Sequence, residues 1–171
     1  MNEAAAYGGI MTGGAIQNNT GHRGAAVNIY SDDRDKRAIF TLEDDGLITR
    51  NTGISANGNE AGGAVFVEDN AAFHMIGGTV SANKASKGGG ICIVDSALQR
   101  GTAEYGTEFL MDGGVISGNR AGTGGGIYSF SNGSFLRSGK IINNTATYSG
   151  GGLYSEGKAL MVTALPIYIM P

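Results

Sequence analysis

The sequence predicts an all-β fold, a parallel β-helix in which the short strands of one repeat stack on those of the next. Two segments, FHMIGGTVSANKASKGGGICIV at 73–94 and FLMDGGVISGNRAGTGGGIYSF at 109–130, are nearly the same. Glycine contributes 31 of 171 residues and proline only 2. Within the segments, large apolar residues alternate with small or polar ones, which is the period of a β-strand and not of a helix.

The repeat has a unit of 26 residues. When the units are aligned on the apolar residue three places before an Asn, the steps between them are 38, 26, 36 and 26 residues, so two units carry insertions of 12 and 10. A repeat of this length indicates a solenoid. The alignment positions are Ile16, Ile54, Val80, Ile116 and Ile142, and glycine clusters follow in the same register at Gly24, Gly62, Gly88, Gly124 and Gly150.

Each unit predicts three short strands, with glycine at the corners between them. Strands this short are stable only when they pair with their counterparts one unit away, about 4.8 Å along a common axis. About five such coils would bury three columns of apolar side chains. These are Leu47, Phe73, Phe109 and Phe135; Ile54, Val80, Ile116 and Ile142; and Val27, Val65, Ile91, Ile127 and Leu153.

A column of Asn residues accompanies the repeat. Its expected members are Asn19, Asn57, Asn83 and Asn119, with Thr145 in the fifth place and Asn144 beside it. Asn tolerates the left-handed conformation, and its amide can both donate and accept along a stack of turns, so we expect a hydrogen-bonded ladder. A row of ligand-binding amides is the alternative.

A leucine-rich repeat, which also carries an Asn after a strand, would need Leu where this chain has Gly78 and Gly114.

The whole chain, 1–171, reads as a single β-helix domain. Neither end offers an obvious polar cap, so we expect a fragment of a longer solenoid. The two insertions fall within 28–46 and 94–108, at the same place in the unit, and should emerge from one edge. Binding surfaces are often built on such edges, although tolerated surface loops are the simpler interpretation.

Composition disfavours several classes of partner. The net charge of −3 and the pI of about 5.3 provide no positive field for nucleic acid or an anionic membrane. Cys92 is the single cysteine, so neither an internal disulfide nor a zinc quartet is possible. No targeting sequence is recognisable, and the apolar C-terminal stretch is too short to cross a bilayer.

No arrangement of residues predicts catalysis, a cofactor or a metal. A polysaccharide-cleaving β-helix needs carboxylates that converge on one face, but Asp112 would stack between Ile76 and Ser138. His22 and His74 lack a nucleophilic partner, and His74 should point to solvent between two inward residues. The acids instead gather in the first insertion, where a calcium site is a weaker alternative to a solvated loop. They are Asp32, Asp33, Asp35, Glu43, Asp44 and Asp45.

An outward aromatic strip is the one candidate binding feature. Phe66, Tyr128 and Tyr154 flank the third interior column and should therefore face outward, where rings can stack on sugars or dock a protein. Cys92 stands in the same column and is read as a small apolar substitute. Stacking of the rings on one another, which would only stiffen the strip, is the alternative.

Residues 11–163 resemble the glycine-rich, right-handed parallel β-helix repeats of bacterial surface proteins, in the pectate-lyase-like superfold. The stretches GGAI at 13–16 and GGAV at 62–65 are similar to one motif of the polymorphic outer-membrane adhesins, whose companion Phe-x-x-Asn motif is not found. The resemblance implies a noncatalytic structural or adhesive module of a cell-surface or secreted protein. Its partners would be glycans or proteins of host or neighbouring cell surfaces, without membrane insertion. The alternative is a truncated portion of a polysaccharide-active enzyme, a lyase or a hydrolase.

Overall fold

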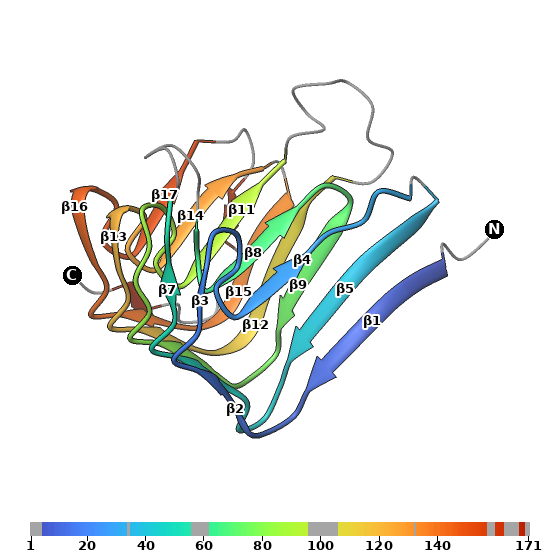
Figure 1. The fold of residues 1–171 in the computed structure, drawn as a ribbon, viewed down its shortest axis with the longest axis horizontal. Coiled ribbons are helices and arrows are strands. Elements are labelled where there is room, and N and C mark those ends of the chain that lie inside the picture. Colours follow the sequence, from blue (N-terminus) through green and yellow to red (C-terminus); the bar gives the residue numbers. More distant parts are fainter. Residues whose placement is uncertain are drawn as a thin grey trace.

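A computed structural model describes residues 5–33, 35–55, 62–95, 106–131, 133–156, 160–162 and 168–169. Within these ranges the chain is all-β, with no helix, and every strand pair is parallel, as the sequence predicts. Figure 1 shows strands from successive repeats lying side by side, from the N-terminal end in blue to the C-terminal end in red. Parallel pairing places equivalent residues of successive repeats next to one another.

The largest sheet has ten strands in the described part of the chain, and we call it the large sheet. Along one path, β12 is followed on one side by β9, β5 and β1 and on the other by β10, β6 and β2, while β15 pairs with β12, β18 and β19. The strands are β1 (Ala5–Met11), β2 (Ala15–Gln17), β5 (Lys36–Leu42), β6 (Leu47–Thr49), β9 (Ala71–Met75), β10 (Thr79–Ser81), β12 (Glu108–Ser117), β15 (Gly133–Ile142), β18 (Leu160–Val162) and β19 (Tyr168–Ile169).

The other strands in the described part of the chain form a five-stranded sheet and two short two-stranded sheets. The five-stranded sheet contains β4 (Val27–Ile29), β8 (Val65–Glu68), β11 (Ile91–Val94), β14 (Ile127–Phe130) and β17 (Leu153–Ser155). The two-stranded sheets pair β3 (Thr20–Gly21) with β7 (Thr52–Gly53), and β13 (Arg120–Thr123) with β16 (Thr145–Ser149).

The register of the five-stranded sheet confirms the third predicted column. Val65 pairs with Val27 on one side and Ile91 on the other, and Ile127 pairs with Ile91 and Leu153. The glycine clusters fall in the register that the sequence predicts, because each begins three residues before its member of this column.

The other two columns are correct only in the third and fourth repeats. Phe73 pairs with Phe109, but the second repeat supplies Phe40 and not Leu47, and Phe135 pairs with Leu110. In the second column Val80 pairs with Ile116 and Ile48. Ile54, assigned to this column from the sequence, has 42% of its surface exposed, and Ile142 pairs with Ser117.

Asn side chains form a continuous hydrogen-bonded ladder. Each Nδ2 donates to the Oδ1 of the next Asn at 2.9–3.1 Å. The sequence separations along the ladder are 32, 32, 36 and 25 residues, in place of the predicted 38, 26, 36 and 26. The members are Asn19, Asn51, Asn83, Asn119 and Asn144.

Two ladder assignments from the sequence were therefore wrong. Asn51 takes the place given to Asn57, which lies outside the described residues, and Asn144 takes the place given to Thr145, which pairs with Arg120. Equal steps of 32 residues from Asn19 to Asn51 and from Asn51 to Asn83 mean that the 12 residues predicted as one insertion within 28–46 are divided between two places. Some of them follow Gly53, where no insertion was predicted.

The left-handed conformation belongs to the residue before each ladder Asn. Asn18, Arg50, Ala82 and Asn143 have φ between 54° and 60°, and Gly118 has a φ of 63°. A side chain such as that of Ala82 makes this conformation unfavourable by about 1–2 kcal/mol. The bend nevertheless recurs in every repeat, because it directs the next residue, the Asn, into the buried ladder.

The main core lies between the sheets. Phe73 stacks between Phe40 and Phe109, with ring centroids 6.1 Å and 5.6 Å apart. Phe73 and Phe109 are fully buried. Fully burying a side chain of this size contributes roughly 1.5–3 kcal/mol, and pairing of the rings adds about 0.5–1.5 kcal/mol.

Candidate functional site

The aromatic strip proposed from the sequence lies on the expected strands. Phe66, Cys92, Tyr128 and Tyr154 pair successively across β8, β11, β14 and β17, as predicted. Their exposure is different from the prediction, since only 4% of Phe66 and 5% of Tyr128 is accessible. Strand alternation correctly placed them on the side opposite the main core, but it carries no information about what covers that side.

These residues form a second, smaller hydrophobic cluster. The rings of Tyr128 and Tyr154 are stacked with centroids 5.5 Å apart, and the Lys87 ammonium lies 4.9 Å from the centre of the Tyr128 ring. The Tyr128 hydroxyl donates to Glu156 Oε2 at 2.8 Å. Burial is the main reason that the pKa of Tyr128 lies above its ordinary value, and the bond to Glu156 raises it further. Binding by the strip stays a prediction, with Tyr154 its most accessible member.

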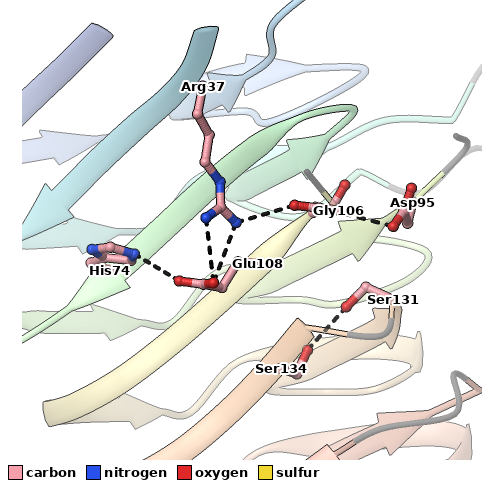
Figure 2. A network of polar contacts seen from close by, with 8 residues as sticks. Arg37, His74, Asp95, Gly106, Glu108, Ser131 and Ser134 are labelled. Carbon is pink, nitrogen blue, oxygen red and sulfur yellow. Dashed lines mark hydrogen bonds and ion pairs between the residues drawn. The ribbon is translucent and has the colours of Figure 1, made fainter. Parts of the chain in front are cut away.

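A charged cluster lies on the large sheet, where β5, β9 and β12 are neighbours (Figure 2). Glu108 accepts a hydrogen bond from Arg37 Nη1 at 3.4 Å and contacts His74 Nε2 at 3.0 Å. Arg37 Nη2 also donates to the Gly106 carbonyl at 3.1 Å. Each of the three side chains has 20–25% of its surface exposed to solvent. No partner for His74 was predicted, because Glu108 and Arg37 are 34 and 37 positions away and meet His74 only through strand register.

The cluster holds Glu108 in its charged form. The contact with His74 is the main reason that the pKa of the Glu108 carboxyl lies below its ordinary value, and Arg37 lowers it further, while burial opposes both. A carboxylate with two cationic or hydrogen-bonding neighbours is a poor proton donor. Arg37 Nε is buried and makes no hydrogen bond, which adds a cost to the arrangement.

Three serine hydroxyls meet inside the fold, at the turn between β14 and β15. Ser129 Oγ lies 2.7 Å from Ser134 Oγ. Ser131 Oγ lies 3.2 Å from Ser134 Oγ, and Figure 2 shows this second contact. At most 2% of each residue is exposed. The hydroxyls satisfy one another in a position that substrate cannot reach, so they are part of the packing.

No metal centre is formed by the described residues. Among them, no group of three or more His, Cys, Asp or Glu side chains is placed to hold an ion. In the acidic first insertion, Asp33 contacts Lys36 at 3.6 Å and accepts a hydrogen bond from the Asp35 backbone. Asp112 pairs with Arg137 at 3.5 Å and has Ser138 as its strand partner, and His22 is exposed.

The described residues contain no helix that is long and apolar enough to cross a membrane.

The exposed aromatic residues lie elsewhere than predicted. Tyr148 on β16 has 82% of its surface exposed, and Tyr30 has 50% exposed. Tyr148 was not predicted as an exposed ring, because the fifth repeat diverges from the pattern around it. The sequence nevertheless contains a sign of it, since Tyr148 is the one large residue in the stretch 145–149, and its four neighbours there are Thr, Ala or Ser.

Comparison of the chain with protein-family models, with curated proteins and with solved structures finds no match.

Proposed function

We propose that the chain is a right-handed parallel β-helix of about five coils and that it serves as a noncatalytic structural or adhesive module of a bacterial cell-surface or secreted protein. The Asn ladder is the observation that carries this proposal. It runs through five repeats, and its inner members are almost completely buried. A chain that uses its buried amides to join successive repeats gains stiffness along the stacking direction, which suits a stalk or a presenting surface.

The distribution of the titratable groups supports a noncatalytic role. Among the described residues, the cluster that combines His with a carboxylate is formed by Arg37, His74 and Glu108, and it neutralises its own charge through internal contacts. The buried thiol of Cys92 has a raised pKa, chiefly because of desolvation, and is therefore a poor nucleophile.

Two measurements test the proposal. Antibodies raised against the chain should label intact cells of the source organism or detect the protein in the culture medium. Labelling that requires permeabilised cells would contradict the surface or secreted location. In parallel, the purified chain should release neither reducing ends nor unsaturated products from a panel of polysaccharides, and turnover of any of them would contradict the noncatalytic role.

A polysaccharide-active enzyme is the second candidate, and the Arg37–His74–Glu108 cluster favours it. A His and a carboxylate, both partly exposed on one face of a sheet, could serve as acid and base toward a sugar. If this candidate is right, Glu108→Gln should abolish cleavage of a polysaccharide. Asp112→Asn, which changes another acid on the same strand, should leave cleavage unchanged.

A further inference from the structure

The side of the molecule formed by β13 and β16 carries a concentration of positive charge. The stretches 81–90, 117–126 and 143–152, which are equivalent in successive repeats, contain Lys84, Lys87 and Arg120 and no acidic residue. The chain as a whole has a net charge of −3. These stretches therefore carry three cations and no acid, whereas the rest of the chain has nine cations and fifteen acids.

Lys84 and Arg120 are stacked directly on one another. They are partners in a parallel bridge, so their backbones lie about 4.8 Å apart, and both side chains are exposed. Among the described residues, neither side chain makes a hydrogen bond or an ion pair, whereas Arg23 pairs with Glu68 and Arg37 with Glu108. Like charges directly opposite one another on neighbouring strands destabilise a sheet. An anion bound across both would remove this repulsion.

Tyr148 lies beside this pair. A register shift between β13 and β16 leaves an extra residue in β16, and Tyr148 lies in this irregular stretch. A side chain added at Gly122 would meet the Tyr148 ring at 3.5 Å, so the ring stands over that glycine. Arg120 and Gly122 are two residues apart on β13, which places their side-chain directions on the same face about 7 Å apart.

We propose that Lys84, Arg120 and Tyr148, which we call the basic aromatic patch, bind an acidic polysaccharide. The exposed ring provides a flat apolar surface for one face of a pyranose ring. The spacing along β13 then brings a carboxylate or sulfate of the same chain within reach of the two cations. This inference rests on the adhesive form of the proposed function and assigns to it a site and a ligand chemistry.

Binding of labelled polysaccharides to the full chain tests the patch. Polygalacturonate carries carboxylates, heparin carries mainly sulfates, dextran is neutral, and single-stranded DNA is an anion without pyranose rings. We expect binding to polygalacturonate, heparin or both, weakening as salt is added, and no binding to dextran. The better of the two anionic chains identifies carboxylate or sulfate as the group recognised.

Substitutions locate the site. Lys84→Gln, Arg120→Gln and Tyr148→Ala should each weaken binding about fivefold, the factor expected for loss of one exposed contact. Lys140→Gln, which removes an exposed cation from β15, and Tyr30→Ala, which removes another exposed ring, should change the affinity by less than about twofold. All five positions are at the surface, and unchanged unfolding midpoints would show that the variants fold.

The outcomes separate this inference from the broader proposal. Absence of binding to both acidic polysaccharides, equal affinity for DNA, or affinity unaffected by the three substitutions would each overturn the patch. None of these results would affect a structural role. Cleavage of a bound polysaccharide would instead overturn the noncatalytic role and leave the patch as a substrate contact.

Discussion

Replacing Asn83 with Ala removes the central link of the Asn ladder. The Asn83 side chain donates to Asn119 Oδ1 at 3.0 Å and to the Ile48 carbonyl at 3.1 Å, and it accepts from Asn51 N and Nδ2 at 2.8 Å and 3.1 Å. Only 1% of the residue is exposed, so water cannot replace these partners. At about 1 kcal/mol for each hydrogen bond, the free energy of unfolding should fall by about 4 kcal/mol.

Asn19→Ala provides the matched control, because it is the same substitution at the exposed end of the same ladder. The Asn19 side chain makes one hydrogen bond, from Nδ2 to Asn51 Oδ1 at 2.9 Å. Its loss should reduce the free energy of unfolding by less than about 1 kcal/mol, because water can reach the site.

Urea denaturation followed by far-ultraviolet circular dichroism measures both variants, and the Asn83→Ala loss corresponds to a melting temperature lower by roughly 10 °C. If the two substitutions reduced the stability equally, or if Asn83→Ala cost less than about 1 kcal/mol, the ladder would not be the continuous stabilising element inferred here.

Three further predictions follow from single positions. Gly124→Ala should lower the free energy of unfolding by more than about 2 kcal/mol, because a Cβ there would collide with the Ile127 carbonyl oxygen at a φ of 64°. Gly13→Ala, with open space around it, should be nearly neutral, and similar denaturation midpoints for the two variants would contradict this. The pKa of Glu108 is lowered mainly by His74, so the charged carboxylate stabilises the fold at pH values above its ordinary pKa of 4.5, and this stabilisation is lost as the pH falls through the lowered pKa. The native protein should therefore be more stable than Glu108→Gln near neutral pH but not in acid. A difference in stability that persists at all pH values would refute the assignment. Cys92, buried and with a raised pKa, should react with a thiol reagent only after denaturation, and rapid labelling of the native protein would show that the second cluster opens.

Local pattern was sufficient to predict an all-β chain with parallel pairing in the third and fourth repeats. There the glycine clusters, the apolar alternation and the Asn occur in one uninterrupted order, so each residue has the same surroundings as its counterpart one repeat away. In the second repeat the same local signal occurs twice. Both Ile48 and Ile54 stand three residues before an Asn, at Asn51 and Asn57, and the local pattern does not distinguish between them.

The choice between those two registers depends on contacts between repeats. Ile48 is fully buried and Asn51 is 1% exposed, because together they continue the column and the ladder on both sides. The same limit applies to the candidate site. Alternation predicted the side of the sheet on which Phe66 and Tyr128 lie, since successive side chains point to opposite faces.

Whether a side chain on a given face is covered or exposed depends on residues distant in sequence. Lys87 lies over Tyr128, and the meeting of His74 with Glu108 follows from strand register, so neither contact is visible in a local pattern. Glycine spacing and apolar alternation in this chain therefore specified the type of fold, because strand formation and chain reversal are local properties. Packing between repeats selected the register, the buried cluster and the exposed Tyr148, because these depend on which distant residues become neighbours.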